Sequence, residues 1–463
     1  MLDQTNTNTL HITAPSYALN CLRLLEDSGW ETWFVGGFVR NSLLKIEVSD
    51  IDMCSQALWN EAQETLENNG IHCIPTGAKH GTITAICEGQ PLEITTFRRE
   101  GNYLDNRHPS EVIFCTDIKE DLKRRDFTIN ALAWHPKRGL IDCFNGIDDL
   151  NNNLLRCVGD PNTRFQEDAL RILRGLRLAS CYGFVFEENT RKALFEEKML
   201  LNNIASERIF SEMTKLLCGK YAMQVLKDYF EIFTVIMPEL APMKDFDQHN
   251  AYHKYDVLDH TLHVLDNSPQ TPRSRWAALF HDIGKPNCFN LDENGVGHFG
   301  GHPKEGAKIA QDIMKRLKFP RNLSIDVRLL VALHDWQIPL SAEGVLHGLD
   351  NFRGDPSLLC DLYKLKQADE LSKANTKSDR YELACQLEKL LKELLDQNFP
   401  LSVKQLEISG DDLIDQGWKP GPDIGRTLNR LLHACAKGKV ENNKEQLLSY
   451  LKREESPAPS GVL

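Results

Sequence analysis

The sequence predicts an α+β fold for the N-terminal part of the chain, a small mixed sheet with helices, followed by an all-α remainder. Three segments rich in β-branched residues indicate the sheet: TITAIC (82–87), LEITTF (92–97) and EVIFCT (111–116). Beyond about residue 150 such segments nearly vanish, and apolar residues recur at helical spacing. The length of 463 residues exceeds what one hydrophobic core supports, so about two to four domains are expected.

The first elements and the domain boundaries can be placed along the chain. Leucines recur at helical spacing between residues 17 and 29, so we expect a helix before a short buried strand at 32–35. The β-rich segments then complete the sheet. The expected parts are a head (1–150), a helical neck (151–220), a helical body (221–380) and a helical tail (381–463).

The composition excludes several classes of protein. Apolar residues make up 41% of the chain and charged residues 26%, as in soluble globular proteins. No apolar run approaches the roughly 18 residues that span a bilayer, and the polar start MLDQTNTNTL is not a signal peptide, so a cytoplasmic protein without membrane contact is expected. The 13 cysteines include no CxxC pair, which favours buried, reduced thiols.

The charge distribution limits how the chain can bind nucleic acid. The formal net charge of −12 argues against binding over the whole surface. Basic stretches at 119–125 and 164–177 are local exceptions, so RNA would have to bind at such patches.

A pair of carboxylates near the N-terminus has the spacing of metal ligands. Asp50 and Asp52 are separated by one residue, so in an extended strand both point to the same face. Two carboxylates on one face can bind Mg²⁺, which in turn binds phosphate oxygens. Upstream, Gly36 and Gly37 allow backbone N–H groups to approach phosphate, and Arg40 adds a positive charge.

The stretch KRRDFTINALAW (123–134) combines cations with a polar amide. We expect Arg124, Arg125 and Asp126 to open a helix that Asp126 caps. The guanidinium groups suit a triphosphate, and Asn130 suits a ribose hydroxyl. An ordinary basic helix start is the alternative.

The stretch QEDALRILRGLRLA (166–179) places Asp168 and Arg171 three residues apart, and Arg174 and Arg177 continue the stripe on one helix face. A carboxylate can accept from an exocyclic amine while the guanidinium donates to the adjacent ring nitrogen. Cytosine and adenine offer that pattern and uracil and guanine the reverse, so the pair would select CTP and ATP. The alternative is a salt-bridge ladder on an exposed helix.

These three motifs, in this order, resemble those of bacterial tRNA nucleotidyltransferases, the CCA-adding enzymes, over about the first 180 residues. The same branch includes bacterial poly(A) polymerases. The resemblance implies a nucleotidyltransferase head that adds CCA to the 3′ end of tRNA from CTP and ATP without a nucleic-acid template, using two Mg²⁺ ions. It also implies tRNA binding by the neck and the tail, and no DNA partner.

The resemblance implies roles for further residues of the head. Glu93 would be the third catalytic carboxylate, although an ordinary strand glutamate is the alternative. The segment 99–112 would be a flexible loop needed for the switch from C to A addition, with Asp105 and Arg107 as its charged pair. Because the loop is kept, CC-only addition is disfavoured.

A second group of motifs lies between residues 250 and 370. HDIGKP (281–286), with a histidine before it and an aspartate after it, resembles the HD phosphohydrolase family. The resemblance implies a metal site in an HD domain, with a transition metal such as Ni, Mn or Co. Its expected ligands are His260, His281, Asp282, His302, His334 and Asp369. The alternative is a helical body whose histidines merely pack.

Three rival functions remain open at this point. A poly(A) polymerase would share the head motifs, but the basic C-terminal extension usual there is absent from this sequence. A phosphohydrolase whose head only binds RNA is disfavoured by the intact Asp50, Asp52 and Arg171. An enzyme that adds only the terminal A would carry the same motifs.

Near the end of the sequence, the stretch 417–432 is expected to begin a helix, which either holds an RNA phosphate at its N-terminus or simply packs against the rest of the protein.

Overall fold

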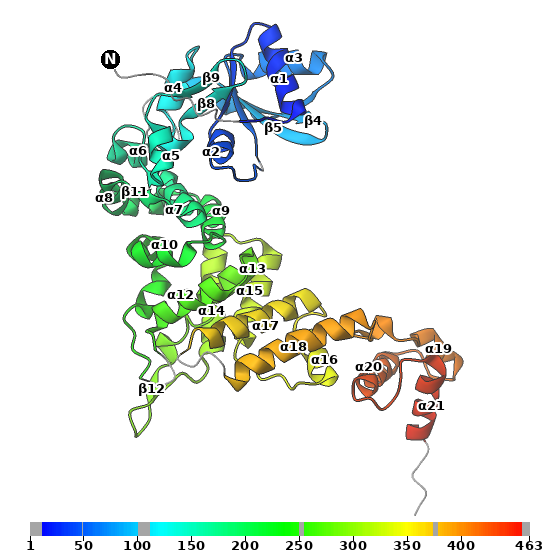
Figure 1. Cartoon of the computed structure of the whole chain (residues 1–463). Coiled ribbons are helices and arrows are strands. Elements are labelled where there is room, and N and C mark those ends of the chain that lie inside the picture. The colour runs from blue at the N-terminus through cyan, green and yellow to red at the C-terminus, as the bar shows by residue number, and fades with distance from the viewer. Residues whose placement is uncertain (1–11, 49, 101–111, 250–253, 374–377, 456–463) are drawn as a thin grey trace, which may run out of the picture. The chain divides into compact units, whose positions relative to one another are not determined.

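The structure is a computed structural model that describes residues 12–48, 50–100, 112–249, 254–373 and 378–455. The chain forms two compact units, residues 1–236 and 237–463. The first unit contains a mixed sheet and helices, and the second is almost entirely helical (Figure 1). The predicted α+β head and helical remainder are therefore confirmed. The division into four parts stays a prediction.

The sheet of the first unit has seven strands in the order β3-β4-β5-β2-β1-β8-β9. Strands β2 and β5 are parallel, and the other neighbours are antiparallel. The expected strands at 32–35 and in TITAIC and LEITTF are all present. The expected strand in EVIFCT is Val112–Phe114, which pairs with Arg98–Glu100 outside this sheet, so its place in the sheet was predicted wrongly. The strands of this sheet are β1 (Thr32–Val35), β2 (Asp52–Ser55), β3 (His72–Gly77), β4 (Thr82–Cys87), β5 (Gln90–Thr96), β8 (Leu132–His135) and β9 (Gly139–Asp142).

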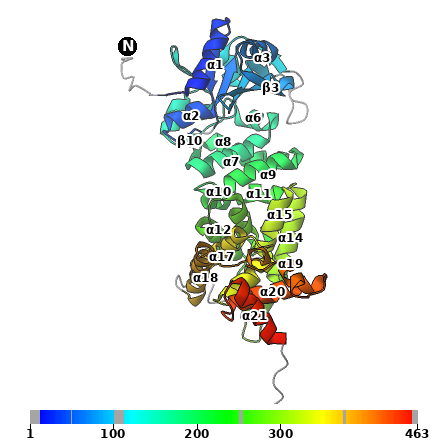
Figure 2. The same cartoon turned by 90° about the vertical axis from the view of Figure 1, so that its right-hand side faces the viewer.

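Helices α1 (Ser16–Asp27) and α3 (Trp59–Asn68) pack side by side against one face of this sheet (Figure 2). The alternating apolar residues of β4 and β5, such as Ile83 and Ile94, are buried beneath them. On the opposite face, α4 (Ile118–Lys123) covers β1 and part of β2. The outer face of β4 and β5 is covered by neither helix, and this leaves room for a site.

Eight further helices complete the first unit over its described residues. Among them, α7 packs against both α9 and α10 (Figure 1). Two short strand pairs accompany them: β6 (Arg98–Glu100) with β7 (Val112–Phe114), and β10 (Leu154–Leu155) with β11 (Val185–Phe186). The remaining helices are α2 (Gly37–Leu43), α5 (Gly146–Asn151), α6 (Pro161–Glu167), α7 (Leu170–Tyr182), α8 (Glu188–Glu196), α9 (Ser206–Leu217), α10 (Ala222–Asp228) and α11 (Phe230–Ile236).

The second unit packs helices around α12, α13, α15 and α17. A short hairpin of β12 (Asn290–Leu291) and β13 (Gly297–His298) precedes α14. The helices are α12 (Val257–Asn267), α13 (Pro272–Phe280), α14 (His302–Arg316), α15 (Arg321–Leu333), α16 (Ala342–Asn351), α17 (Pro356–Leu371), α18 (Asp379–Asp396), α19 (Gly410–Asp415), α20 (Pro422–Ala436) and α21 (Lys444–Glu455). Over the described part of the chain, no helix combines the length and the apolar character needed to cross a membrane.

Candidate active site and metal cluster

One cavity of about 1280 Å³ lies within the first unit, between the open face of the sheet and helices α7 and α9. The glycine turn, the carboxylates and the arginines singled out in the sequence all line it. They are Gly36, Gly37, Arg40, Asp50, Asp52, Glu93, Arg124, Arg125, Asp126, Asn130, Asp168, Arg171, Arg174 and Arg177. Asp105 and Arg107 lie outside the described residues.

The three carboxylates meet at the junction of β2 and β5. Asp52 begins β2 and lies directly opposite Glu93 of the parallel strand, while Asp50 just precedes β2 and is exposed. Burial raises the pKa of Asp52, Arg125 lowers it in part, and the charge of Asp50 raises it again. Burial, followed by the charges of Asp52 and Asp50, also raises the pKa of Glu93. Carboxylates that repel one another in this way are stabilised by a bound cation.

Asp121 of α4 fixes two of the arginines and was missed by sequence reasoning. Arg124 Nη2 lies 2.7 Å from Asp121 Oδ1, and Arg125 Nη2 lies 3.0 Å from Oδ2. Burial would raise the pKa of Asp121, but the two guanidinium groups outweigh it and lower the pKa to about 2. The spacing of three and four residues was a signal that could have revealed these pairs.

The expectation that residues 124–126 open a capped helix is wrong. Helix α4 ends at Lys123 with Arg124 as its C-cap, and a single 3₁₀ turn, Thr128–Asn130, follows. The reason is that Asp126 is engaged elsewhere: its Oδ2 lies 2.7 Å from Arg174 Nη2, and its Oδ1 accepts from the side chain of Asn130 at 2.9 Å. Arg174 in particular keeps the pKa of Asp126 far below its usual range, against the effect of burial.

Backbone geometry at Gly36 brings the glycine turn close to the arginines. Its φ of +65° is unfavourable for other residues, and an added Cβ would lie 3.0 Å from Arg125 Nη1. Arg40, one turn later, is buried; it donates to Asn130 Oδ1, and its guanidinium lies 4.9 Å from the centre of the Tyr182 ring. Tyr182 was also missed by sequence reasoning.

The expected stripe on one helix face is correct only for the arginines. Asp168 has an extended backbone and separates α6 from α7, so it lies outside the helix that carries Arg171. Asp168 Oδ2 accepts from Arg208 Nη2 at 2.9 Å, whereas Arg171 Nη1 lies 2.5 Å from Glu167 Oε2. Arg171 is buried, so the alternative of an exposed salt-bridge ladder does not describe it.

Helix α9 supplies side chains that pair with Asp168 and Arg177. Besides Arg208, it carries Glu212, whose Oε2 lies 2.7 Å from Arg177 Nε. No feature of the sequence pattern near residues 208–212 indicated these contacts, because they join segments some 35 to 40 residues apart in the chain.

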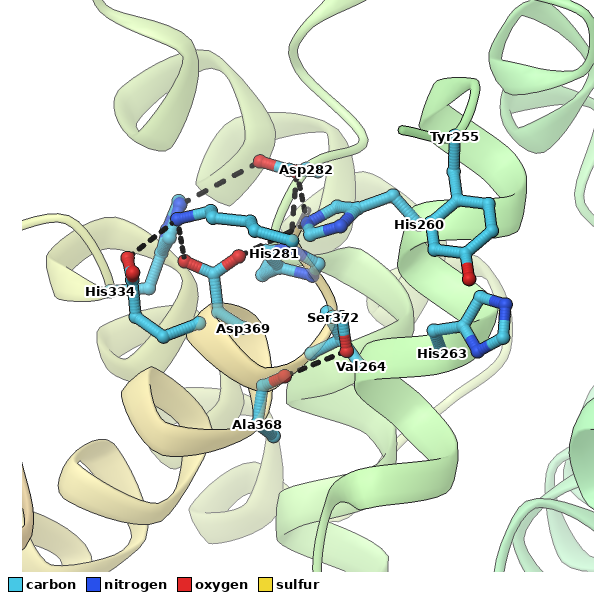
Figure 3. A network of polar contacts seen from close by, with 12 residues as sticks. Tyr255, His260, His263, Val264, His281, Asp282, His334, Ala368, Asp369 and Ser372 are labelled. Atoms are coloured by element: carbon cyan, nitrogen blue, oxygen red, sulfur yellow. Dashed lines mark hydrogen bonds and ion pairs between the residues drawn. The ribbon is translucent and has the colours of Figure 1, made fainter. Parts of the chain in front are cut away.

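In the second unit, all six expected HD residues come together, and Figure 3 labels all of them except His302. They form two groups of potential ligands, one of His260, His281 and Asp369 and the other of Asp282, His302 and His334, each with ligand atoms within 4.8 Å of one another. His260 Nε2 lies 3.0 Å from Asp369 Oδ1, and His281 Nε2 lies 3.1 Å from Asp282 Oδ2.

The orientation of three rings fits a metal site. The Nδ1 atoms of His281, His302 and His334 each lie 2.8 Å from a backbone carbonyl oxygen. An Nδ1–H that donates to a carbonyl leaves the Nε2 lone pair facing the cluster. The Nε2 atoms of His302 and His334 are 3.2 Å apart, so two acceptors face each other and require a proton or a cation between them.

Profiles of known protein families match three segments of this chain. A family profile described as the Poly A polymerase head domain matches residues 32–156, and one for an RNA- and SrmB-binding site of polymerase A matches residues 183–244. A third profile, for tRNA nucleotidyltransferase domain 2, matches residues 304–451. The chain is therefore a nucleotidyltransferase with the head of the poly(A) polymerase type.

Individual relatives identify the family within the class of nucleotidyltransferases. The chain is 32% identical over 438 residues to the CCA-adding enzyme of Lactobacillus helveticus, covering 94% of this chain and 96% of that one. It is 34% identical over 439 residues to the enzyme of Lactobacillus delbrueckii subsp. bulgaricus, with the same coverage. The chain belongs to the family of CCA-adding enzymes.

Solved structures share the fold. The CCA-adding enzyme of Bacillus stearothermophilus in complex with CTP has a TM-score of 0.68 at 24% identity, covering 96% of this chain and 98% of that one. The Thermotoga maritima CCA-adding enzyme complexed with tRNA has a TM-score of 0.54 at 21% identity, covering 96% and 97%.

Proposed function

We propose that this chain adds CCA to the 3′ end of tRNA from CTP and ATP, with the cavity of the first unit as its active site. The observation that carries this proposal is the pairing of Asp52 and Glu93 across β2 and β5, facing a wall of arginines. Membership of the CCA-adding family supports the reaction, and relatives solved with CTP, with ATP and with tRNA support the substrates.

Asp50, Asp52 and Glu93 would hold Mg²⁺. Bound there, Mg²⁺ would lower the pKa of the attacking ribose hydroxyl and offset the charge on the departing pyrophosphate. The raised pKa values of Asp52 and Glu93 fit this role, since bringing a cation between them removes the repulsion.

The arginines divide the remaining work. Arg124 and Arg125, held by Asp121, would bind the triphosphate together with Arg40 and the backbone of Gly36 and Gly37. Because their partner is buried and fully charged at neutral pH, these guanidinium groups stay in place before the nucleotide arrives.

Asp168 and Arg171 would read the base. Their present partners, Arg208 and Glu167, hold the two side chains at the cavity wall, where they would face an incoming nucleotide. The carboxylate would accept from the amine of cytosine or adenine and the guanidinium would donate to the ring nitrogen.

The proposed function is tested with three acceptors: tRNA ending before CCA, tRNA ending in C, and tRNA ending in CC, each with single nucleoside triphosphates. Stepwise addition of C, C and A is expected. Addition of A alone, to tRNA ending in CC, would identify an A-adding enzyme; long runs of A on unrelated RNA would identify a poly(A) polymerase.

A second function is favoured by the histidine cluster of the second unit. We propose that His260, His281, Asp282, His302, His334 and Asp369 hold transition-metal ions such as Ni, Mn or Co, as in HD phosphohydrolases. The opposed Nε2 atoms of His302 and His334 support this, because a cation removes their repulsion. A metal there would activate water against a phosphate ester.

Metal analysis tests the cluster directly. Protein purified without added chelator is expected to carry bound transition metal, and His302→Ala together with His334→Ala is expected to lose part of it. If wild-type protein binds neither Ni, Mn nor Co, even after dialysis against each ion, the cluster only packs the helices and binds no metal.

The head, neck, body and tail remain our proposed division, with RNA contacts in the neck and the tail. Support for the tail comes from α20, which begins at Pro422 after Gly421 without a side-chain cap, so its first N–H groups can bind a phosphate. The profile of tRNA nucleotidyltransferase domain 2 extends over this helix.

A further inference from the structure

The outer face of β4 and β5 carries a ladder of threonines beside the catalytic carboxylates. Thr82, Thr84 and Thr95 line the same cavity as Asp52 and Glu93. The register explains the arrangement, because Thr84 lies directly opposite Glu93, and Thr82 directly opposite Thr95. The threonine side of the cavity is therefore continuous with the carboxylates.

These threonines are joined in pairs. The Oγ1 atoms of Thr82 and Thr95 are 3.0 Å apart, and those of Thr84 and Thr76, on β3, are 2.9 Å apart. A pair of hydroxyls has two protons and uses one of them within the pair. Each pair can thus offer one donor and several acceptor lone pairs to a ligand, a combination that matches another hydroxyl group.

The cavity walls on the two sides of the carboxylates differ in charge. On the side of α7, the cavity is lined by arginines, including Arg124, Arg171 and Arg174, and these suit the negative charge of a triphosphate. On the side of β4, the lining residues are threonines and Pro91, with Arg98 beyond them. A reaction between two substrates requires a second site on the other side of the metal ligands. Among the described residues that line this side of the cavity, those beside Glu93 on β4 are uncharged.

We infer that the threonine face binds the ribose of the terminal nucleotide of the acceptor RNA, with Thr82 and Thr84 contacting its 2′-hydroxyl. This inference rests on the proposed function. Thr84 is beside Glu93, so a ribose held there places its 3′-hydroxyl near the carboxylates where the new bond forms. Thr82 and Thr84 are positioning residues and take no part in the chemical step.

The test compares two acceptors that differ by one oxygen: tRNA ending in CC with a ribose at its last nucleotide, and the same RNA with a 2′-deoxyribose there. Wild-type enzyme is expected to add A to the ribose form with the higher kcat/KM. In Thr84→Val and Thr82→Val, this preference is expected to fall by about three- to tenfold, the value of one or two hydrogen bonds. The KM for ATP is expected to stay unchanged.

Two control variants separate contact from folding. Thr84→Ser keeps the hydroxyl and is expected to restore the preference for ribose. Thr96→Val removes a buried hydroxyl that donates to Ala57 O on the other face of β5, so it is expected to lower the melting temperature and leave the preference intact.

The outcomes are distinct. A wild-type enzyme that extends both acceptors equally, or valine variants that keep the full preference, would overturn the inference while the proposed function stands. A wild-type enzyme that extends neither acceptor would overturn the proposed function and this inference with it.

Discussion

At the scale of single residues, the candidate active-site cavity is lined by ion pairs between buried or half-buried groups. Asp121 holds Arg124 and Arg125, Asp126 holds Arg174, and Glu167 holds Arg171. Each pair fixes a guanidinium that would otherwise be mobile, at the cost of removing both charges from water. Preorganised cations of this kind favour a highly charged ligand.

Removal of one carboxylate tests the catalytic centre. Asp52→Asn is expected to reduce nucleotide addition by roughly a hundredfold or more, because a lost metal ligand weakens transition-state stabilisation by several kcal/mol. Radiolabelled CTP incorporation measures the rate. Circular dichroism should match the wild type, and Glu64→Gln, at an exposed position of α3, is the control. A variant that retains more than about a tenth of the rate contradicts the metal-ligand role.

Base selection is tested at Asp168. Asp168→Ala combined with Arg171→Ala is expected to raise the use of UTP or GTP relative to CTP, because the discriminating acceptor and donor are gone. Arg171 also donates to the carbonyl of Arg124, so the thermal stability of the double variant must be measured alongside. Asp168→Asn alone serves as a milder version. Unchanged selectivity at a lower rate would show that these side chains only support the helices.

At the scale of secondary-structure elements, short helices and one parallel strand pair place polar residues at the cavity. Helix α4 has one turn and a half, and its buried Asp121 is the link between the sheet and the arginines. The parallel pairing of β2 with β5 is what brings Asp52 opposite Glu93. Both features depend on elements that would be unstable in isolation and gain their stability from tertiary packing.

The pH dependence of stability reports on Asp121. Its folded pKa of about 2 lies below the usual value near 3.9, so its ion pairs stabilise the fold above about pH 4 by about 2–3 kcal/mol. This contribution is lost as the pH falls from about 4 to 2. Urea unfolding at pH 7 and pH 3 measures it, and Asp121→Asn should be less stable than the wild type at pH 7 by an amount that shrinks at pH 3. An equal difference at both values would contradict the role.

At the scale of the whole molecule, two sites lie in different compact units. The cavity of the first unit is lined by residues 35–218, and the histidine cluster is formed by residues 260–369 of the second. The two sites share no residue, so their chemistry is separable by mutation.

Independent loss of the two proposed activities is therefore expected. His281→Ala or Asp282→Ala should remove hydrolysis of phosphate esters such as 2′,3′-cyclic nucleotides and leave CCA addition nearly intact, whereas Asp52→Asn should do the reverse. Transition metals should stimulate the hydrolysis and Mg²⁺ the transfer, because imidazole ligands favour softer ions. Loss of CCA addition in a folded His281→Ala variant would show that the cluster serves the head instead.

The sequence by itself determined the α+β class of the head, strands of its sheet including β4 and β5, the helical remainder and the motif residues that line the cavity and form the histidine cluster. Hydrophobic alternation specified β4 and β5, and motifs such as Asp50 with Asp52 or His281 with Asp282 are local patterns that can be read along the chain. The tertiary structure decided which partners hold these residues. Arg208 reaches Asp168 from 40 positions away, and four elements bring the histidines together. Such contacts depend on packing between distant segments, and local spacing carries no information about them.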